Sequence, residues 1–210
     1  QFAIIGLLPG YLEKPNSSLV FMMQKLIELS DCSDSGFYLD DHQKLHKVLK
    51  QREGNHKKTL LLGVSFALLD FAEQFPSSLS HTIVMETGGM KGRRKEIVRD
   101  ELHSQLKHNL GVKEIQSEFG MTELLSQAYA KTDGIFHCPP WMKVFVRHPN
   151  NPMGVQKHGT GCLNIIDLAN KNSCAFIATD DLAKVYDDGS FVVLGRVDTS
   201  DIRGCNLMVN

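Results

Sequence analysis

The sequence predicts an α/β protein in which a lobe with a parallel sheet is followed by a smaller, antiparallel β-rich part. In the first part, short apolar runs alternate with segments of helical periodicity. After about residue 133, short strand-like runs follow one another and are separated by Gly, Asn, Asp and Pro. We therefore expect two domains, an α/β lobe over residues 1–133 and a β-rich subdomain over residues 134–210.

The expected lobe alternates strands with helices along the chain. Its strands are apolar runs bounded by turn residues, at residues 3–8, 59–64, 82–85 and 115–118. Its helices show apolar periodicity or a polar composition, at residues 19–29, 40–52, 65–74 and 91–110. Strands that alternate with helices in this way favour a parallel sheet, because each helix returns the chain to the starting end of the sheet.

The expected β-rich subdomain contains short strands with turn residues between them. They lie at residues 142–147, 161–166, 175–179, 182–186 and 191–194. The segment Asp187-Asp188-Gly189 separates the last two runs and is typical of a hairpin turn. These strands therefore predict an antiparallel sheet or a small barrel.

Composition excludes several classes of partner. The chain has 23 basic and 24 acidic residues and no basic stripe, so nothing indicates a nucleic-acid partner. No apolar run reaches the roughly 18 residues that a membrane-spanning helix needs. Five cysteines without a C-x-x-C pair indicate reduced thiols, a cytoplasmic location and no structural zinc site.

The first candidate motif is Glu86-Thr87-Gly88-Gly89, which closes an expected strand. Paired glycines allow a flat ligand to approach the backbone closely. The N-terminus of the helix expected next would favour an anion. A plain strand-to-helix turn would give the same residues, so this motif alone does not distinguish a ligand site from an ordinary turn.

The second motif spans residues 117–123 and combines an aromatic ring, a glycine, a hydroxyl and a carboxylate at a strand end. In open α/β sheets, ligands bind at that end of the strands. Phe119 could stack on a base, Thr122 could contact a phosphate, and Glu123 could help to hold Mg²⁺. The alternative is a helix start, capped by Thr122 and favoured by the charge of Glu123.

The third motif joins Thr179-Asp180-Asp181-Leu182 to the segment Gly195-Arg196-Val197-Asp198. A carboxylate can accept hydrogen bonds from both vicinal hydroxyls of a ribose. A nearby arginine can donate to the same ribose or to a phosphate. The alternative is ordinary turn chemistry, since Asp and Gly are frequent in hairpin loops.

The order of these motifs resembles that of the adenylate-forming enzymes, which include acyl-CoA synthetases, luciferase-like enzymes and aryl acid ligases. The resemblance runs from about Thr82 to Gly204. Residues 1–27 and 201–209 further resemble the acyl-protein synthetases, the fatty-acid-activating component of bacterial luminescence fatty-acid reductases. We therefore expect the adenylate-forming fold, with ATP and Mg²⁺ as cofactors.

The resemblance implies a role for each matching residue of the first two motifs. Gly88 and Gly89 match the turn on the adenine side. Phe119, followed by Gly120, stands where the family usually has a tyrosine that packs on adenine. Thr122 matches the ligand of the α-phosphate, and Glu123 matches the carboxylate linked to Mg²⁺.

In the third motif, the resemblance assigns the ribose to Asp181. Asp180 stands where the family usually has glycine, which leaves open which of the two carboxylates faces the ribose. Arg196 matches an arginine that contacts ribose or phosphate. Arg203 stands near the position of a lysine in many relatives, but its spacing from Arg196 is one residue longer.

The activity implied is the ATP-dependent conversion of a carboxylic acid, most simply a fatty acid, to an acyl-adenylate. Cys205 matches the thiol that then receives the acyl group, and Arg203 would lower its pKa. Cys205 could instead be an ordinary small apolar residue. Cys138 beside His137 is a rival thiol, although neighbours on a strand point to opposite faces. An acyl-accepting protein or reductase is the implied partner.

Two other functions remain open. An acyl-CoA or aryl-CoA ligase would use coenzyme A and would not need Cys205. A nucleotide-binding or scaffold subunit would have no turnover of its own. The family's Ser/Thr/Gly-rich phosphate loop does not occur in these residues, so we expect the chain to be truncated upstream of Gln1. The family's mobile C-terminal domain does not occur either, which fits the acyl-protein synthetase branch.

Overall fold

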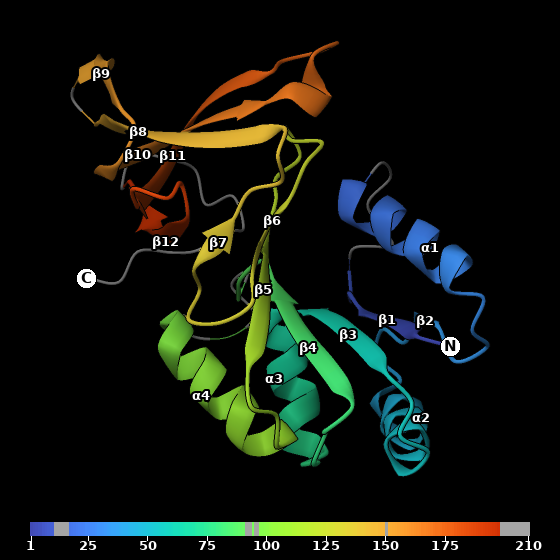
Figure 1. The fold of residues 1–210 in the computed structure, drawn as a ribbon. Coiled ribbons are helices and arrows are strands. Elements are labelled where there is room, and N and C mark those ends of the chain that lie inside the picture. Colours follow the sequence, from blue (N-terminus) through green and yellow to red (C-terminus); the bar gives the residue numbers. More distant parts are fainter. Residues whose placement is uncertain (11–16, 91–93, 95–96, 150, 198–210) are drawn as a thin grey trace. The chain divides into compact units, whose positions relative to one another are not determined.

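The computed structural model describes residues 1–10, 17–90, 94, 97–149 and 151–197 (Figure 1). The chain forms two compact units, Gln1–Gln116 and Ser117–Asn210. The sequence places its change of character at about residue 133, within the second of these units. In the described residues, no helix is both long and apolar enough to cross a membrane.

The first unit contains a parallel sheet with the strand order β2-β1-β3-β4. The strands are β1 (Ala3–Leu7), β2 (Gly36–Phe37), β3 (Thr59–Val64) and β4 (Thr82–Thr87). Apolar residues on both faces of β3 are buried, Leu61 on one face and Leu62 and Val64 on the other, as expected for a parallel sheet covered by helices. The predicted parallel α/β lobe is therefore confirmed.

Four helices pack around this sheet. They are α1 (Ser18–Ser30), α2 (His42–Gly54), α3 (Ser65–Gln74) and α4 (Arg99–Leu110). Ser17 and Asp41 cap α1 and α2 by accepting a hydrogen bond from a backbone N–H in the first turn. Figure 1 shows α1 on one side of β1 and β3, and α2 and α3 on the other.

The start of α4 differs from the sequence prediction. A helix was expected from Lys91, but α4 begins at Arg99, and Val98 before it is extended with ψ of 154°. Asp100 and Glu101 occupy the first turn of α4, where the helix dipole favours negative charge. The described residues of the preceding segment, 94, 97 and 98, lie outside any helix.

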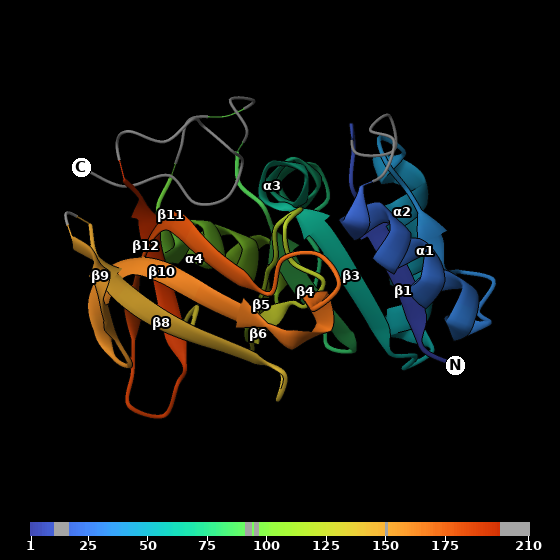
Figure 2. The same ribbon diagram turned by 90° about the horizontal axis from the view of Figure 1, so that it is seen from above.

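The second unit is an antiparallel sheet with the strand order β5-β6-β7-β12-β11-β10-β8-β9. Its strands are β5 (Ile115–Phe119), β6 (Ala128–Ala130), β7 (Phe136–His137), β8 (Met142–His148), β9 (Asn151–Gln156), β10 (Gly159–Asp167), β11 (Phe176–Val185) and β12 (Phe191–Arg196). Figure 2 shows β8, β10 and β11 running side by side. The predicted antiparallel subdomain is therefore confirmed.

Two strands expected in the second unit are a single strand. The sequence predicts strands at residues 175–179 and 182–186, with a turn between them. In the structure, β11 runs without interruption from Phe176 to Val185. Polar residues that suggested a turn thus lie within a paired strand, and this places the third motif inside the sheet.

Candidate functional site

Asp181 and Arg196 form a cross-strand pair in the second unit. They are register partners on β11 and β12, so their side chains leave the same face of the sheet. Arg196 Nε lies 3.1 Å from Asp181 Oδ1, and the two side chains are 18% and 5% exposed. This contact has the distance of an ion pair without hydrogen-bond alignment, and Asp181 Oδ1 accepts no hydrogen bond. A buried carboxylate oxygen in that state is unusual, and the hydroxyl of a ligand would satisfy it.

A bulge in β11 produces this arrangement. Three residues, Thr179–Asp181, lie opposite the single residue Leu163 of β10. Thr179 Oγ1 donates a 2.9 Å hydrogen bond to the Leu163 carbonyl and accepts a 3.1 Å bond from Asp181 N–H. On the partner strand β12, Gly195 has φ of 145°, a backbone conformation that favours glycine. Bulges of this kind redirect side chains, here that of Asp181.

The structure separates the two carboxylates of this motif. The Asp181 side chain is 5% exposed and faces Arg196. The Asp180 side chain is 54% exposed and pairs with Arg147, with Asp180 Oδ1 3.8 Å from Arg147 Nη2. Asp181, and not Asp180, is therefore the carboxylate that lies beside Arg196.

The environment of Asp181 disfavours its charge. Burial raises the pKa of Asp181 to about 6, because a low-dielectric site destabilises the carboxylate. The Arg196 guanidinium opposes this effect, whereas the charges of Asp180 and Glu123 raise the pKa further. Because the charge of Glu123 acts on the pKa of Asp181, the second motif is electrostatically connected to the pair of Asp181 and Arg196.

Thr122 and Glu123 lie in an exposed turn that leads from β5 to β6. The turn is closed by a 3.1 Å hydrogen bond from Leu124 N–H to the Met121 carbonyl. The alternative of a helix start is wrong here, because the chain continues into β6 and not into a helix. Both side chains are therefore accessible to a ligand from solvent.

A buried carboxylate that the sequence did not reveal holds this turn. Asp167 accepts hydrogen bonds from the N–H groups of Leu125 at 3.0 Å and Ser126 at 2.9 Å, and from Ser126 Oγ at 2.7 Å. Asn170 Nδ2 donates a 2.8 Å bond to the Glu123 carbonyl. Asp167 and Asn170 therefore position the turn, and the available signal was a carboxylate and an amide at the end of β10 and in the segment that follows it.

Phe119 lies in the core of the second unit. It is 3% exposed, and its ring centroid lies 5.8 Å from that of Phe136 and 5.4 Å from that of Phe191. A β-carbon added to Gly120 would lie 2.5 Å from Glu118 Oε1, so the end of the Glu118 side chain would have to move to admit it. The packing gives Phe119 a structural role, and its contact with adenine stays a prediction.

The first motif lies in the first unit, at the end of β4. Gly88 has φ of 68°, a left-handed conformation that glycine adopts without strain. Among the described residues, the first helix after this turn is α4, which begins at Arg99. The expected help of a helix N-terminus at Gly88 and Gly89 is therefore wrong, and their adenine-side role rests on the close approach that glycine allows.

Glu86 of the first motif is held by a network that the sequence did not reveal. Glu86 is 4% exposed, and Ser65 Oγ donates a 3.2 Å hydrogen bond to its Oε2. Arg99 Nε lies 3.7 Å and His103 Nε2 lies 3.5 Å from Glu86 Oε1. Ser65 Oγ also lies 3.4 Å from the Gly88 carbonyl. This network anchors the turn to the start of α3 and to α4.

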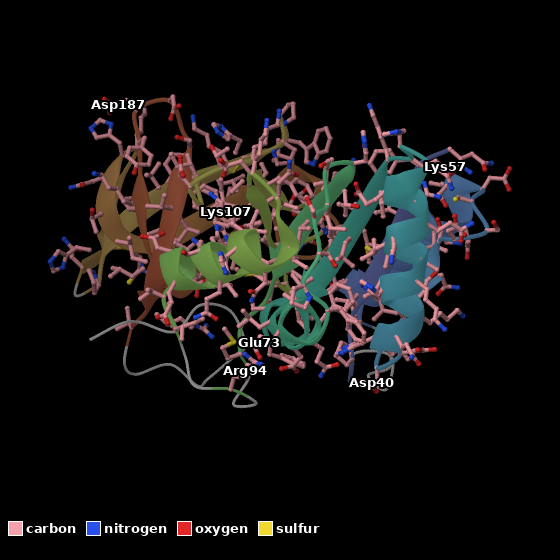
Figure 3. The ribbon with its side chains drawn as sticks, turned by 90° about the horizontal axis from the view of Figure 1, so that it is seen from below. Asp40, Lys57, Glu73, Arg94, Lys107 and Asp187 are labelled. Atoms are coloured by element: carbon pink, nitrogen blue, oxygen red, sulfur yellow. The ribbon has the colours of Figure 1, made fainter. Side chains whose placement is uncertain are left out.

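Arg94 ties the connection after this turn to α3. Its guanidinium donates to Asp70 Oδ1 and to Glu73 Oε1, each at 2.8 Å. Arg94 and Glu73 are adjacent in Figure 3. These hydrogen bonds raise the pKa of Arg94 and lower that of Glu73, so both groups stay charged.

The candidate acyl acceptor Cys205 and Arg203 lie outside the described residues. The rival Cys138 is described, and burial raises the pKa of its thiol to about 11. Such a thiol is protonated at neutral pH and is a poor nucleophile. Among the described residues, no group of three His, Cys, Asp or Glu side chains could hold a metal ion.

The fold of this chain is similar to that of several solved structures. ATP-bound MatB from Rhodopseudomonas palustris matches 92% of this chain with 13% identity and a TM-score of 0.65. Amide bond synthetase McbA from Marinactinospora thermotolerans matches 92% with 14% identity and a TM-score of 0.61. A mutant form of coronafacic acid ligase from Pectobacterium brasiliense matches 96% with 18% identity and a TM-score of 0.59.

The TM-scores show that the chain shares the fold of these proteins. The chain spans about 40% of the length of these solved structures. No protein-family model and no curated protein matches the chain.

Proposed function

We propose that this chain carries part of the nucleotide site of an ATP-dependent enzyme that converts a carboxylic acid to an acyl-adenylate. The observation that carries the proposal is Asp181. It is a buried carboxylate with an oxygen that accepts no hydrogen bond, and it faces an arginine. A ribose supplies the hydroxyl donors that such an oxygen lacks.

In this proposal the second unit binds the ribose and the α-phosphate of ATP. Asp181 accepts hydrogen bonds from the ribose hydroxyls, and Arg196 donates to the ribose or to a phosphate. Thr122 contacts the α-phosphate. Glu123 fits Mg²⁺, because its exposed carboxylate provides a hard oxygen and Mg²⁺ in such sites takes its other ligands from phosphates and water. Gly88 and Gly89 keep their proposed place on the adenine side.

The proposed reaction is a displacement at the α-phosphorus. A carboxylate oxygen of the acid forms a bond to this phosphorus, the bond to the bridging oxygen breaks, and pyrophosphate leaves with its electron pair. The chain contributes by positioning and by offsetting negative charge, with Thr122 and Arg196 as donors. Mg²⁺ would neutralise part of the phosphate charge when bound.

The finer proposal concerns substrate and acceptor. We propose a fatty acid as the substrate and Cys205 as the acceptor. Its thiolate attacks the acyl carbonyl, a thioester forms, and AMP leaves. The raised pKa of Cys138 supports this choice between the two thiols. Coenzyme A as the acceptor is the second candidate, and a subunit without turnover is the third.

The experiment is ATP–pyrophosphate exchange on the longest available form of the protein, across a panel of fatty and aromatic acids. We expect one class of acid to stimulate exchange and Glu123→Gln to reduce it strongly. Labelled acid on Cys205→Ser and on Cys138→Ser then identifies the acceptor, and a requirement for coenzyme A would favour the second candidate. ATP binding without exchange for any acid would contradict the ligase and favour the subunit.

A further inference from the structure

Arg147 on β8 reaches the bulge of β11 across β10. Its Nη1 donates a 2.8 Å hydrogen bond to the Thr179 carbonyl and a 2.9 Å bond to Asn164 Oδ1. A longer contact of 3.5 Å joins the same nitrogen to the Leu163 carbonyl. The side chain is 12% exposed, so these bonds are largely shielded from water. One guanidinium thus connects three strands at the point where β11 departs from regular pairing.

The bulge depends on such side-chain donors. Residues 179–181 have no register partners in β10 apart from the single opposing residue Leu163, so the strand ladder does not fix their backbone. Thr179 Oγ1 and Arg147 supply the missing hydrogen bonds instead. Buried backbone carbonyls in native proteins are almost always paired, so losing Arg147 would release the Thr179 carbonyl and allow the bulge to relax.

Asp180 provides a second contact between Arg147 and the bulge of β11. Its carboxylate pairs with Arg147 at 3.8 Å, and its own carbonyl accepts a 2.9 Å bond from the N–H of Val197, the residue after Arg196. The position that usually holds glycine in the resembling motif thus carries, in this chain, a charge that faces Arg147. Asp181 leaves the opposite face, toward Arg196.

We propose that Arg147 is a positioning residue that, through the Thr179 carbonyl and Asp180, sets the bulge that aims Asp181 at the ribose of a nucleotide. Arg147 does not itself touch the ligand. This inference rests on the proposed function, and it adds a residue of β8 that none of the three motifs contains. The inference predicts that Arg147 affects recognition of the ribose and not nucleotide binding in general.

The test compares ATP with 2′-deoxy- and 3′-deoxy-ATP by calorimetric titration of the longest available form. Wild type is expected to bind ATP about tenfold more tightly than at least one deoxynucleotide, because a hydrogen bond to a carboxylate is lost. Arg147→Met should weaken ATP binding while leaving that deoxynucleotide almost unchanged, so the preference falls to about twofold. Arg147→Lys should recover part of it, because the amine keeps the charge and one donor.

Two further variants complete the design. Asp180→Asn should reduce the preference by about twofold, because its contact with Arg147 is long and half-exposed. Lys143→Met, on the same strand and face as Arg147, is the matched control and should keep the wild-type preference. Asp180→Asn and Arg147→Lys test the proposal if Arg147→Met fails to fold.

The outcomes separate the inference from the function on which it rests. An equal loss for ATP and the deoxynucleotides in the Arg147 variants would show a general structural role and overturn the inference. An unchanged preference would overturn it as well. Wild type that binds no ATP would instead contradict the proposed function, and this result is seen before any variant is made.

Discussion

Two buried carboxylates, Glu86 in the first unit and Asp181 in the second, stand beside arginines in very different states. Glu86 accepts a hydrogen bond from Ser65 and lies between Arg99 and His103. Asp181 has an ion pair with Arg196, yet its Oδ1 accepts no hydrogen bond. Removing a carboxylate from a buried network of partners is costly, whereas a buried carboxylate oxygen that accepts no hydrogen bond can accept one from a ligand.

The comparison predicts opposite effects of neutralising the two groups. The largest effect is expected at Glu86. Glu86→Gln would leave Arg99 and His103 without their carboxylate, and breaking a buried ion pair costs about 3 kcal/mol. We expect a fall in Tm of about 10 °C, measured by calorimetry. Glu28→Gln, which removes a surface ion pair with Lys25, is the control and should leave Tm unchanged. An equally stable Glu86→Gln protein would contradict the structural role.

Neutralising Asp181 should instead stabilise the unliganded protein. Burial raises the pKa of Asp181 to about 6 from an ordinary value of 3.8, so its ionised form costs stability at pH 7.5. Asp181→Asn removes this cost, and we expect a gain of about 2 kcal/mol, seen as a higher Tm. A marked loss of stability in Asp181→Asn would show that Asp181, like Glu86, stabilises the fold, and would contradict this prediction.

The pH dependence sharpens the contrast. The stabilising contribution of protonated Asp181 is full below about pH 4 and is lost as the pH rises through about 6, so unliganded stability from this group falls over that range. ATP needs the ionised carboxylate, so its Kd should rise below pH 6 by up to tenfold for each pH unit. Titrations between pH 5 and 8 check this, and a flat Kd would contradict the assignment of Asp181.

The smallest effect is expected at the thiols. Because burial raises the pKa of Cys138 to about 11, Cys138→Ser should leave acyl transfer from a labelled acid unchanged within twofold. The measurement is thioester formation resolved by denaturing electrophoresis. Loss of labelling in Cys138→Ser would move the acceptor role from Cys205 to Cys138.

Sequence patterns predicted the elements with strong periodicity and missed features that depend on distant partners. Apolar runs and periodicity were sufficient for β3 and α3, whose bounds match the expectation at residues 59–64 and 65–74. The bulge in β11 was read as a turn, because Asp and Thr are frequent in turns and Leu163 lies far back in the sequence.

The side chains that position the candidate site could not be predicted from the sequence for the same reason. Asp167 bonds to Ser126 across 41 residues, and Asn170 bonds to Glu123 across 47. No local pattern reports such contacts. The motif residues Thr122, Glu123, Asp181 and Arg196 were identified from their order, whereas the side chains that position them required the fold.

The most direct test of the central claim is calorimetric titration of ATP into wild type and Asp181→Asn at pH 7.5, in the longest available form. The account predicts that Asp181→Asn folds at least as stably as wild type and binds ATP at least tenfold more weakly, because a hydrogen bond to a charged group is lost. Equal ATP affinity in the two proteins would contradict the account and leave Asp181 as an ordinary member of the sheet.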